Sequence, residues 1–197
     1  MKKIYLIVTL ILSSVFGFAQ TQEEVISMIT QTASTMKEFK CVFVQEKTSY
    51  LLAKPAVSEG EMEYYANTQN LSWIYTKPVH LELHFDHDVI RKVTDEGEEI
   101  LDAKKDRMYY GMMNVIMGCA SGNILFDKSM FNIDIQEDGT YWKVEMTPKK
   151  REMKRMFSKL TFFFGLDDKI IDRVEFTEVS GDATMILFYN KQCLWED

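Results

Sequence analysis

The densest group of side chains that could do chemistry lies in residues 80–88, which hold all three histidines of the chain. Imidazoles and carboxylates close together are typical of zinc sites and of general acid–base pairs. Here they alternate with leucine and phenylalanine, the pattern of a strand with one buried and one solvated face. On such a strand His80 and His84 lie about 13 Å apart, too far to share a zinc ion whose ligands each lie within ~2.1 Å. The pattern therefore indicates a solvated face rather than a metal site.

No other arrangement of residues in the sequence supports catalysis. Because every histidine lies in residues 80–87, none stands elsewhere to activate a serine or cysteine nucleophile. There is no G-x-S-x-G motif, and Gly60, Gly111 and Gly118 do not form a phosphate-binding loop. We therefore expect no catalytic residue, no metal and no cofactor, and a protein that is not an enzyme. A secreted enzyme with a divergent site that uses His84 stays open as an alternative.

The cysteines do not form a recognisable site. Cys41, Cys119 and Cys193 are an odd number, so at least one thiol is free or pairs outside the chain. There is no C-x-x-C, and Cys41 alternates with Phe43 as a buried apolar residue would. One disulfide among the three is compatible with the sequence, which does not select the pair.

The elements that would position these groups are strands. Between Ser58 and Phe85, three segments alternate large apolar with polar residues and are separated by short polar links, which predicts antiparallel neighbours. Their expected buried face is rich in aromatic residues. It consists of Met62, Tyr64, Leu71, Trp73, Tyr75, Leu81, Leu83 and Phe85.

Two apolar helices are expected to cover this face. Gln22–Glu38 has apolar residues at intervals of three and four, with Glu23 and Glu24 in the first turn. Residues 107–118 are rich in methionine and end in glycine, which predicts a short helix that interrupts the strands. We interpret it as a flexible lid, although ordinary core packing explains a methionine stripe equally well.

The rest of the chain reads as antiparallel strands and hairpins. The expected strands are Phe39–Leu52, Val89–Thr94, Glu98–Leu101, Met130–Gln136, Thr140–Met146, Phe157–Phe164, Ile170–Val179 and Thr184–Tyr189. With 197 residues, the chain suits one domain, which we place at residues 20–197. The expected fold class is α+β, mainly antiparallel β.

The first nineteen residues have the features of a secretory signal peptide. Lys2 and Lys3 precede an apolar run, and a small-x-small site ends at Ala19. The run is shorter than the ~20 residues of a membrane-spanning helix. We expect cleavage after Ala19 and an exported, periplasmic protein. Removing Lys2 and Lys3 takes the net charge from −7 to −9, and such an acidic chain argues against nucleic acid as a partner.

An ordered set of motifs then resembles a known family. After the signal peptide and first helix come Phe43-Val-Gln45, Ser58-x-Gly60 and Leu71-x-Trp73-x-Tyr75-x-x-Pro78. The short apolar helix, a phenylalanine-rich strand, Val174-x-Phe176 and Gly181-x-x-Thr184 follow in order. This series resembles the periplasmic outer-membrane lipoprotein carrier family, LolA, over nearly the whole chain after residue 19.

The resemblance implies a fold, a function and partners. The fold would be an open half-barrel of antiparallel strands, covered by the N-terminal helix and the lid helix. Its apolar cavity would shield lipoprotein acyl chains during transfer from the inner to the outer membrane. The implied partners are acylated lipoproteins, an inner-membrane ABC exporter and an outer-membrane acceptor, and we expect a monomer. The alternative is a periplasmic sensor or scaffold that binds envelope lipid or protein on the same half-barrel, without transport.

The residues expected to contact acyl chains lie on the predicted inner face and on the lid. They are Phe43, Met62, Tyr64, Leu71, Trp73, Tyr75, Leu81 and Leu83, with Met112, Met113, Ile116 and Met117 on the lid. One departure from the family concerns the lid. Six and five residues before the tryptophan the family often has Arg-Pro, whose arginine ties the lid closed, whereas this chain has Asn67 and Thr68.

Overall fold

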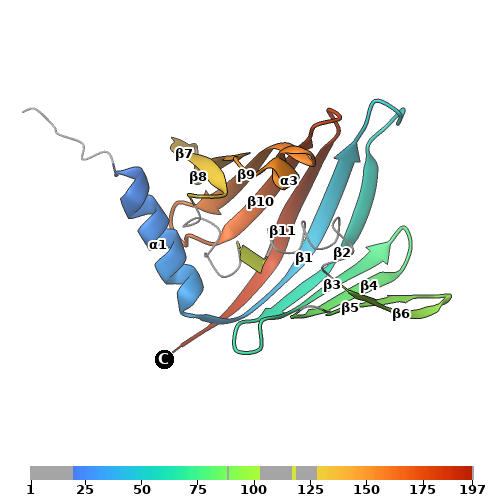
Figure 1. The fold of residues 1–197 in the computed structure, drawn as a ribbon. Helices are drawn as coiled ribbons and strands as arrows, with labels where there is room; N and C mark the ends of the chain where they lie inside the picture. Colours follow the sequence, from blue (N-terminus) through green and yellow to red (C-terminus); the bar gives the residue numbers. More distant parts are fainter. Residues whose placement is uncertain (1–19, 88, 103–116, 119–127, 197) are drawn as a thin grey trace, which may run out of the picture.

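A single antiparallel sheet of eleven strands forms the body of the protein (Figure 1). The structure is a computed structural model, and it describes residues 20–87, 89–102, 117–118 and 128–196. The strands are β1 (Met36–Thr48), β2 (Ala56–Tyr65), β3 (Asn70–Lys77), β4 (Leu81–Asp86), β5 (Val89–Thr94), β6 (Gly97–Asp102), β7 (Phe131–Asp138), β8 (Tyr141–Pro148), β9 (Phe157–Gly165), β10 (Ile171–Glu178) and β11 (Ala183–Trp195). A short helix, α3 (Arg151–Lys154), precedes β9.

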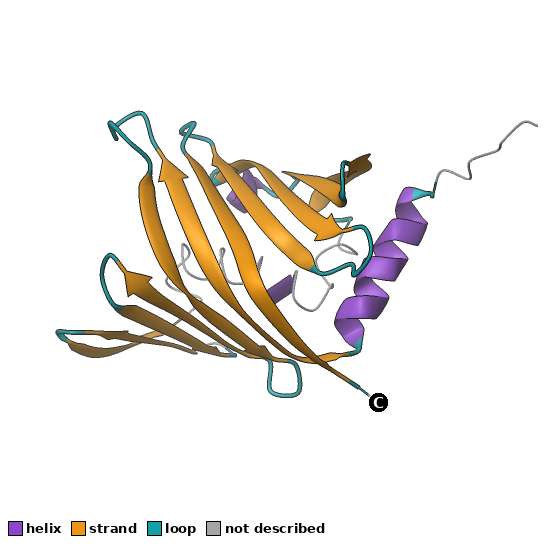
Figure 2. Ribbon diagram, turned by 180° about the vertical axis from the view of Figure 1, so that it is seen from behind, coloured by secondary structure: helices purple, strands orange, loops and turns teal. Residues whose placement is uncertain are grey.

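The sheet consists of two meanders joined at its centre. The spatial order is β6-β5-β4-β3-β2-β1-β11-β10-β9-β8-β7, so the first and last strands pair with each other. The edge strands β6 and β7 lie at opposite ends of this order and do not close the sheet. The ribbon curves strongly around one face, as both views show (Figure 2). The expected α+β open half-barrel is confirmed.

Helix α1 (Gln22–Ser34) packs against one end of the curved face. A capping box fixes its start: Thr21 Oγ1 accepts from the Glu24 amide, and the Glu24 carboxylate accepts from the Thr21 amide at 2.8 Å. Its buried face consists of Val25, Ile26, Ile29 and Ala33.

The predicted helix was too long at its C-terminal end. We expected it to reach Glu38, but α1 ends at Ser34 and Met36 begins β1. Met36 matches the helical spacing, yet it is buried as the first inward residue of a strand that pairs with Trp195. The tertiary pairing therefore overrides the local periodicity.

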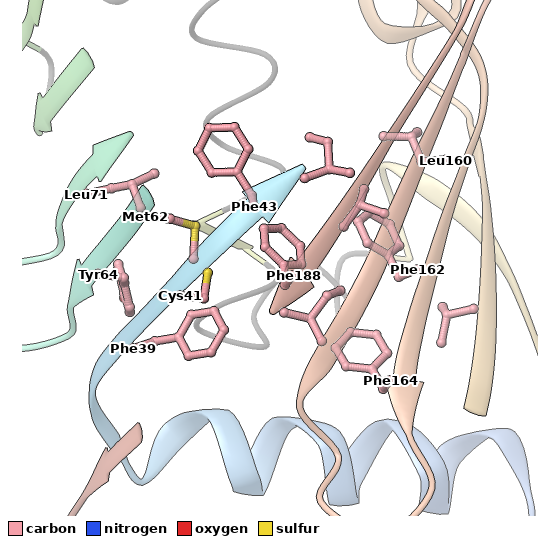
Figure 3. Close-up of a cluster of buried hydrophobic side chains, with 14 of the residues drawn as sticks. Phe39, Cys41, Phe43, Met62, Tyr64, Leu71, Leu160, Phe162, Phe164 and Phe188 are labelled. Atoms are coloured by element: carbon pink, nitrogen blue, oxygen red, sulfur yellow. The ribbon is translucent and has the colours of Figure 1, made fainter. Parts of the chain in front are cut away.

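The concave face carries a continuous apolar core. Side chains from β1, β2, β3, β9 and β11 point into one space beside α1 (Figure 3). The Phe43 and Trp73 rings stack with centroids 4.1 Å apart, and Tyr75 meets Phe43 edge-on at 5.3 Å. Offset and edge-on aromatic pairs of this kind add stability beyond the area that they bury.

Two predicted segments lie largely outside the described residues. The signal peptide, residues 1–19, is one of them. Of the predicted lid helix, residues 107–118, only Met117 and Gly118 are described; both are helical, and Met117 is half-buried against the core. Within the described part of the chain, no helix combines the length and apolar character needed to cross a bilayer.

Candidate lipid-binding cavity

The inner face of the sheet changes character along each strand. Because side chains alternate between faces, every second residue lines the concave side. On β1 this series is Phe39, Cys41 and Phe43, all buried, followed by Gln45 and Lys47, which are partly exposed. Helix α1 covers the apolar end of the series, so the opposite end forms a polar mouth.

A cavity of about 610 Å³ occupies this mouth. This volume lies within the range of about 300–1,000 Å³ in which proteins hold small molecules. Its walls come from eight strands, β1–β5 and β9–β11, and from the link between β3 and β4. The lining residues are Gln45, Lys47, Ser58, Tyr75, Lys77, Pro78, Val79, His80, Leu81, Lys92, Thr94, Phe157, Phe176, Glu178 and Thr184.

One part of the cavity wall is aromatic and aliphatic. Phe157 and Phe176 contact each other across β9 and β10, with ring centroids 5.7 Å apart. Tyr75 stands at the boundary between dry and wet surfaces, and its hydroxyl donates to Gln45 Oε1 at 3.1 Å. Such a wall can bind an apolar chain and holds no reactive group.

Three lysines from β1, β3 and β5 also line the cavity, each beside a carboxylate. Lys47 Nζ lies 3.3 Å from Glu178, and Lys77 Nζ lies 2.7 Å from Glu59. Lys92 Nζ lies 3.8 Å from Glu99 on the neighbouring strand. These pairs are partly exposed, so each contributes little to stability.

Exposed apolar side chains surround the mouth. Tyr50 and Leu51, in the link between β1 and β2, are 81% and 77% exposed. Val79, in the β3–β4 link, and Val179, just after β10, are also mostly exposed. Several large apolar residues grouped at one end of a protein mark a surface that meets a partner or a membrane.

The fold was compared with known proteins. No family model matches the sequence, and no curated protein sequence matches it. Among solved structures, the lipoprotein LppX of Mycobacterium tuberculosis aligns over 87% of this chain and 96% of its own, with a TM-score of 0.51 and 10% identity. MucB of Pseudomonas aeruginosa, solved with MucA, aligns over 88% of this chain and 57% of its own, with a TM-score of 0.52 and 9% identity.

The chain has the fold of LppX and of the part of MucB with which it aligns. It spans little more than half of the length of the MucB chain. A LolA superfamily protein from Nitrosomonas europaea also aligns, over 88% of this chain and 94% of its own, with a TM-score of 0.47 and 10% identity. The likeness to LppX and MucB confirms the half-barrel fold expected from the sequence, and identities this low bear on the fold alone.

The predicted acyl-chain residues divide into three groups within the LppX-like half-barrel. Tyr75 and Leu81 line the cavity. Six others are fully buried in the core beside it: Phe43, Met62, Tyr64, Leu71, Trp73 and Leu83. On the predicted lid, Met117 packs against this core, whereas Met112, Met113 and Ile116 lie outside the described residues.

Sequence reasoning missed the polar half of the cavity. Lys47, Lys77 and Lys92 follow the buried apolar residues at the strand period, so they share the inner face. Extending that period beyond the last apolar residue would have located them. Phe176 follows the buried Val174 at the same period. Phe157 lies at a register shift between β9 and β10, which leaves no local signal in the sequence.

The histidine cluster forms a hydrogen-bonded chain that runs from His80, at the rim of the cavity, onto the outer, convex face of the sheet. The Glu82 carboxylate lies 3.1 Å from His80 Nε2 and 2.7 Å from His84 Nε2. Ser72 on β3 lies opposite His84, with its Oγ 2.9 Å from His84 Nδ1. Hydrogen bonds from His84 and then from His80 hold the pKa of the Glu82 carboxyl below its usual value.

This cluster differs from our expectation in one respect. The two histidines are separated along the strand, as predicted, but their side chains converge on one carboxylate. Among the described residues, no group of three or more histidine, cysteine, aspartate or glutamate side chains has the arrangement of a metal site. Asn67, where the family often has arginine, lies in the β2–β3 turn, and its side chain accepts from the Thr68 amide at 2.8 Å.

Two of the three cysteines are described, and both are free thiols. Cys41 is buried on the inner face of β1, and Cys193 is half-buried on β11. Burial raises the pKa of the Cys41 thiol to about 12 and also raises that of Cys193. Both thiols are therefore mainly protonated near pH 7, and the buried Cys41 is expected to be the less reactive of the two.

Proposed function

We propose that this protein is a periplasmic carrier that shields lipoprotein acyl chains in its cavity and carries them from the inner to the outer membrane. The observation that supports it most is the open cavity of about 610 Å³ at the mouth of a half-barrel, one part of whose wall is aromatic and aliphatic. The proposal includes no enzymatic role and no metal or cofactor.

The energetics of transfer suit this geometry. Each methylene removed from water is stabilised by about 0.8 kcal/mol, so a chain needs many apolar contacts to leave a membrane. Tyr75, Leu81, Phe157 and Phe176 offer such contacts. A carrier must also release its cargo, and a cavity open at one end of a half-barrel provides a short exit path.

The surroundings of the mouth support exchange with membranes or membrane proteins. Tyr50, Leu51 and Val79 expose apolar side chains beside the opening. In the proposed cycle this rim meets an inner-membrane ABC exporter during loading and an outer-membrane acceptor during release. Contact at the rim would place the cavity directly against the donor or acceptor of the chain.

Binding of a fluorescent fatty acid tests the cavity, with one variant that fills it and one that does not. Ser58 lines the cavity, so Ser58→Trp places a large side chain in the space that the chain would occupy. Val57, its neighbour on β2, is exposed and does not line the cavity, so Val57→Trp is the matched control. We expect saturable binding in the wild type and Val57→Trp, and loss of at least about tenfold in affinity in Ser58→Trp. Equal binding by both variants would show that the fatty acid binds outside this cavity.

A sensor or scaffold is the second candidate, and the fold shared with MucB favours it, since MucB was solved in complex with MucA. Such a protein would bind lipid or a partner protein without moving cargo. Transfer of a labelled acylated peptide from donor to acceptor vesicles separates the two functions. A carrier accelerates transfer in proportion to its concentration, whereas a sensor retains the peptide.

A further inference from the structure

Three strands place a lysine on the concave side of the half-barrel. Lys47, Lys77 and Lys92 come from β1, β3 and β5, and all three line the cavity. Glu178 is the one carboxylate among the lining residues of the described chain. The protein as a whole carries a formal charge of −7, so cations gathered inside its mouth do not reflect its general surface.

These lysines keep the capacity to bind an anion. An ammonium group has three hydrogen-bond donors, and one neighbouring carboxylate does not occupy all of them. The side chains of Lys47 and Lys92 are 44% and 31% exposed, so their ion pairs are weak and can rearrange when a ligand enters. An anion that enters the mouth would meet donors from more than one strand.

The two sides of the cavity differ in polarity. Phe157 and Phe176 form an aromatic side on β9 and β10, whereas Lys47, Lys77 and Lys92 come from β1, β3 and β5 on the other side. Through Thr184 of β11, Phe176 lies level with Lys47. A ligand that satisfies both regions must be apolar at one end and anionic at the other.

We propose that the cavity binds a single-chain amphiphile whose carboxylate or phosphate head is held by Lys47, Lys77 and Lys92 while its chain lies on the aromatic side. The proposal rests on the proposed function, because it requires that the cavity hold an acyl chain. It goes beyond that function in the ligand: the acyl chains of a lipoprotein are joined through esters and an amide and carry no carboxylate or phosphate, so the amphiphile is a second, free ligand of the same cavity. The cavity volume of about 610 Å³ suits one small ligand.

The test compares dansylaminoundecanoic acid with its methyl ester, which has the same chain and no charge. The mouth variant is Lys47→Gln/Lys77→Gln/Lys92→Gln. The control variant, Lys40→Gln/Lys143→Gln/Lys159→Gln, removes the same charge from lysines outside the cavity, which are likewise paired with glutamates. We expect the wild type and the control to bind the acid about tenfold or more tightly than the ester. The mouth variant should bind both probes equally, at the ester's affinity.

Each alternative result has one meaning. If the wild type binds acid and ester equally, the lysines do not hold the head and the inference is wrong, although the cavity still binds chains. If neither probe binds, the proposed function itself fails. If inorganic phosphate competes with the acid at similar concentrations, the lysines bind a free anion as tightly as the acid. The chain then contributes nothing to binding, which contradicts an amphiphilic ligand.

Discussion

At the scale of single residues, the packing around Gly60 gives a sharp test of the inner face. Gly60 lies opposite Phe43, and a Cβ at this position would overlap the Phe43 ring and the Ile74 carbonyl oxygen. The stacked Phe43–Trp73 pair therefore depends on the absence of a side chain here.

Gly60→Ala should lower the free energy of unfolding by about 1–3 kcal/mol, because the added methyl overpacks a closed core. Urea denaturation monitored by tryptophan fluorescence measures the change. Glu61→Ala, at the next and exposed position, is the control and should change stability by less than about 0.5 kcal/mol. A fully stable Gly60→Ala would contradict the close packing of Phe43 on Gly60.

The cysteines provide a second test at this scale. Since burial raises the pKa of Cys41 to about 12, its thiol should react slowly with a thiol reagent at neutral pH and quickly after denaturation. Mass spectrometry of Cys119→Ser/Cys193→Ser, which retains Cys41, measures the rate. Cys41→Ser/Cys119→Ser retains the more accessible Cys193 and should react faster. Similar rates in both folded proteins would be inconsistent with burial of Cys41.

Glu82 gives the pH-dependent prediction. Its pKa lies below the ordinary value of 4.5 because His84 and His80 bind the carboxylate. The stabilisation is therefore present above pH 4.5 and is lost as the pH falls through the lowered pKa. The stability advantage of the wild type over Glu82→Gln should shrink across this acid range in denaturation curves. An advantage that persists unchanged to lower pH would rule out the carboxylate charge as its origin.

At the scale of elements, the link between β1 and β2 is the segment to test for membrane exchange. Leu51→Ser removes an apolar side chain that is 77% exposed and contributes nothing to the core. We expect transfer between vesicles to slow several-fold while fatty-acid affinity and stability stay unchanged. Ile100→Ser, an exposed apolar residue on β6, is the control. Equal transfer rates in Leu51→Ser and the wild type would show that this link takes no part in the exchange with vesicles.

The elements also show what could be read from the sequence. Strict alternation predicted β2, β3 and β4 and the buried face that includes Trp73 and Leu83, because a half-buried strand imposes that period. The end of α1 and the length of β11 could not be predicted from alternation. Beyond Tyr189, β11 passes Asn190 at a φ of 52° and continues along β1 to Trp195. This pairing joins the two ends of the chain, and no local sequence pattern predicts it.

The candidate site was predicted less completely than the fold, because apolar residues were expected to line it. Most of them, such as Phe43 and Met62, fill the core. The cavity instead lies where the apolar series gives way to Gln45, Lys47 and Lys77. Whether a buried face is filled or hollow depends on sheet curvature, which alternation alone does not encode.

At the scale of the whole molecule, the architecture separates stability from binding. The apolar core lies toward α1, where Val25 and Ile29 close one end of the half-barrel. The cavity lies at the other end, where the strands diverge into exposed links (Figure 1). A ligand can therefore enter and leave without opening the core, as a carrier of acyl chains requires.

Native mass spectrometry with lipid extraction, on protein purified from the cells that naturally produce it, tests the proposed carrier function most directly. We predict that the wild type and Val57→Trp co-purify with a lipoprotein or an acylated peptide, and that Ser58→Trp does not. Free lipid alone would favour the sensor over the carrier. A wild-type protein that is empty under gentle conditions and also fails to take up a fluorescent fatty acid would contradict the proposal that its cavity holds acyl chains.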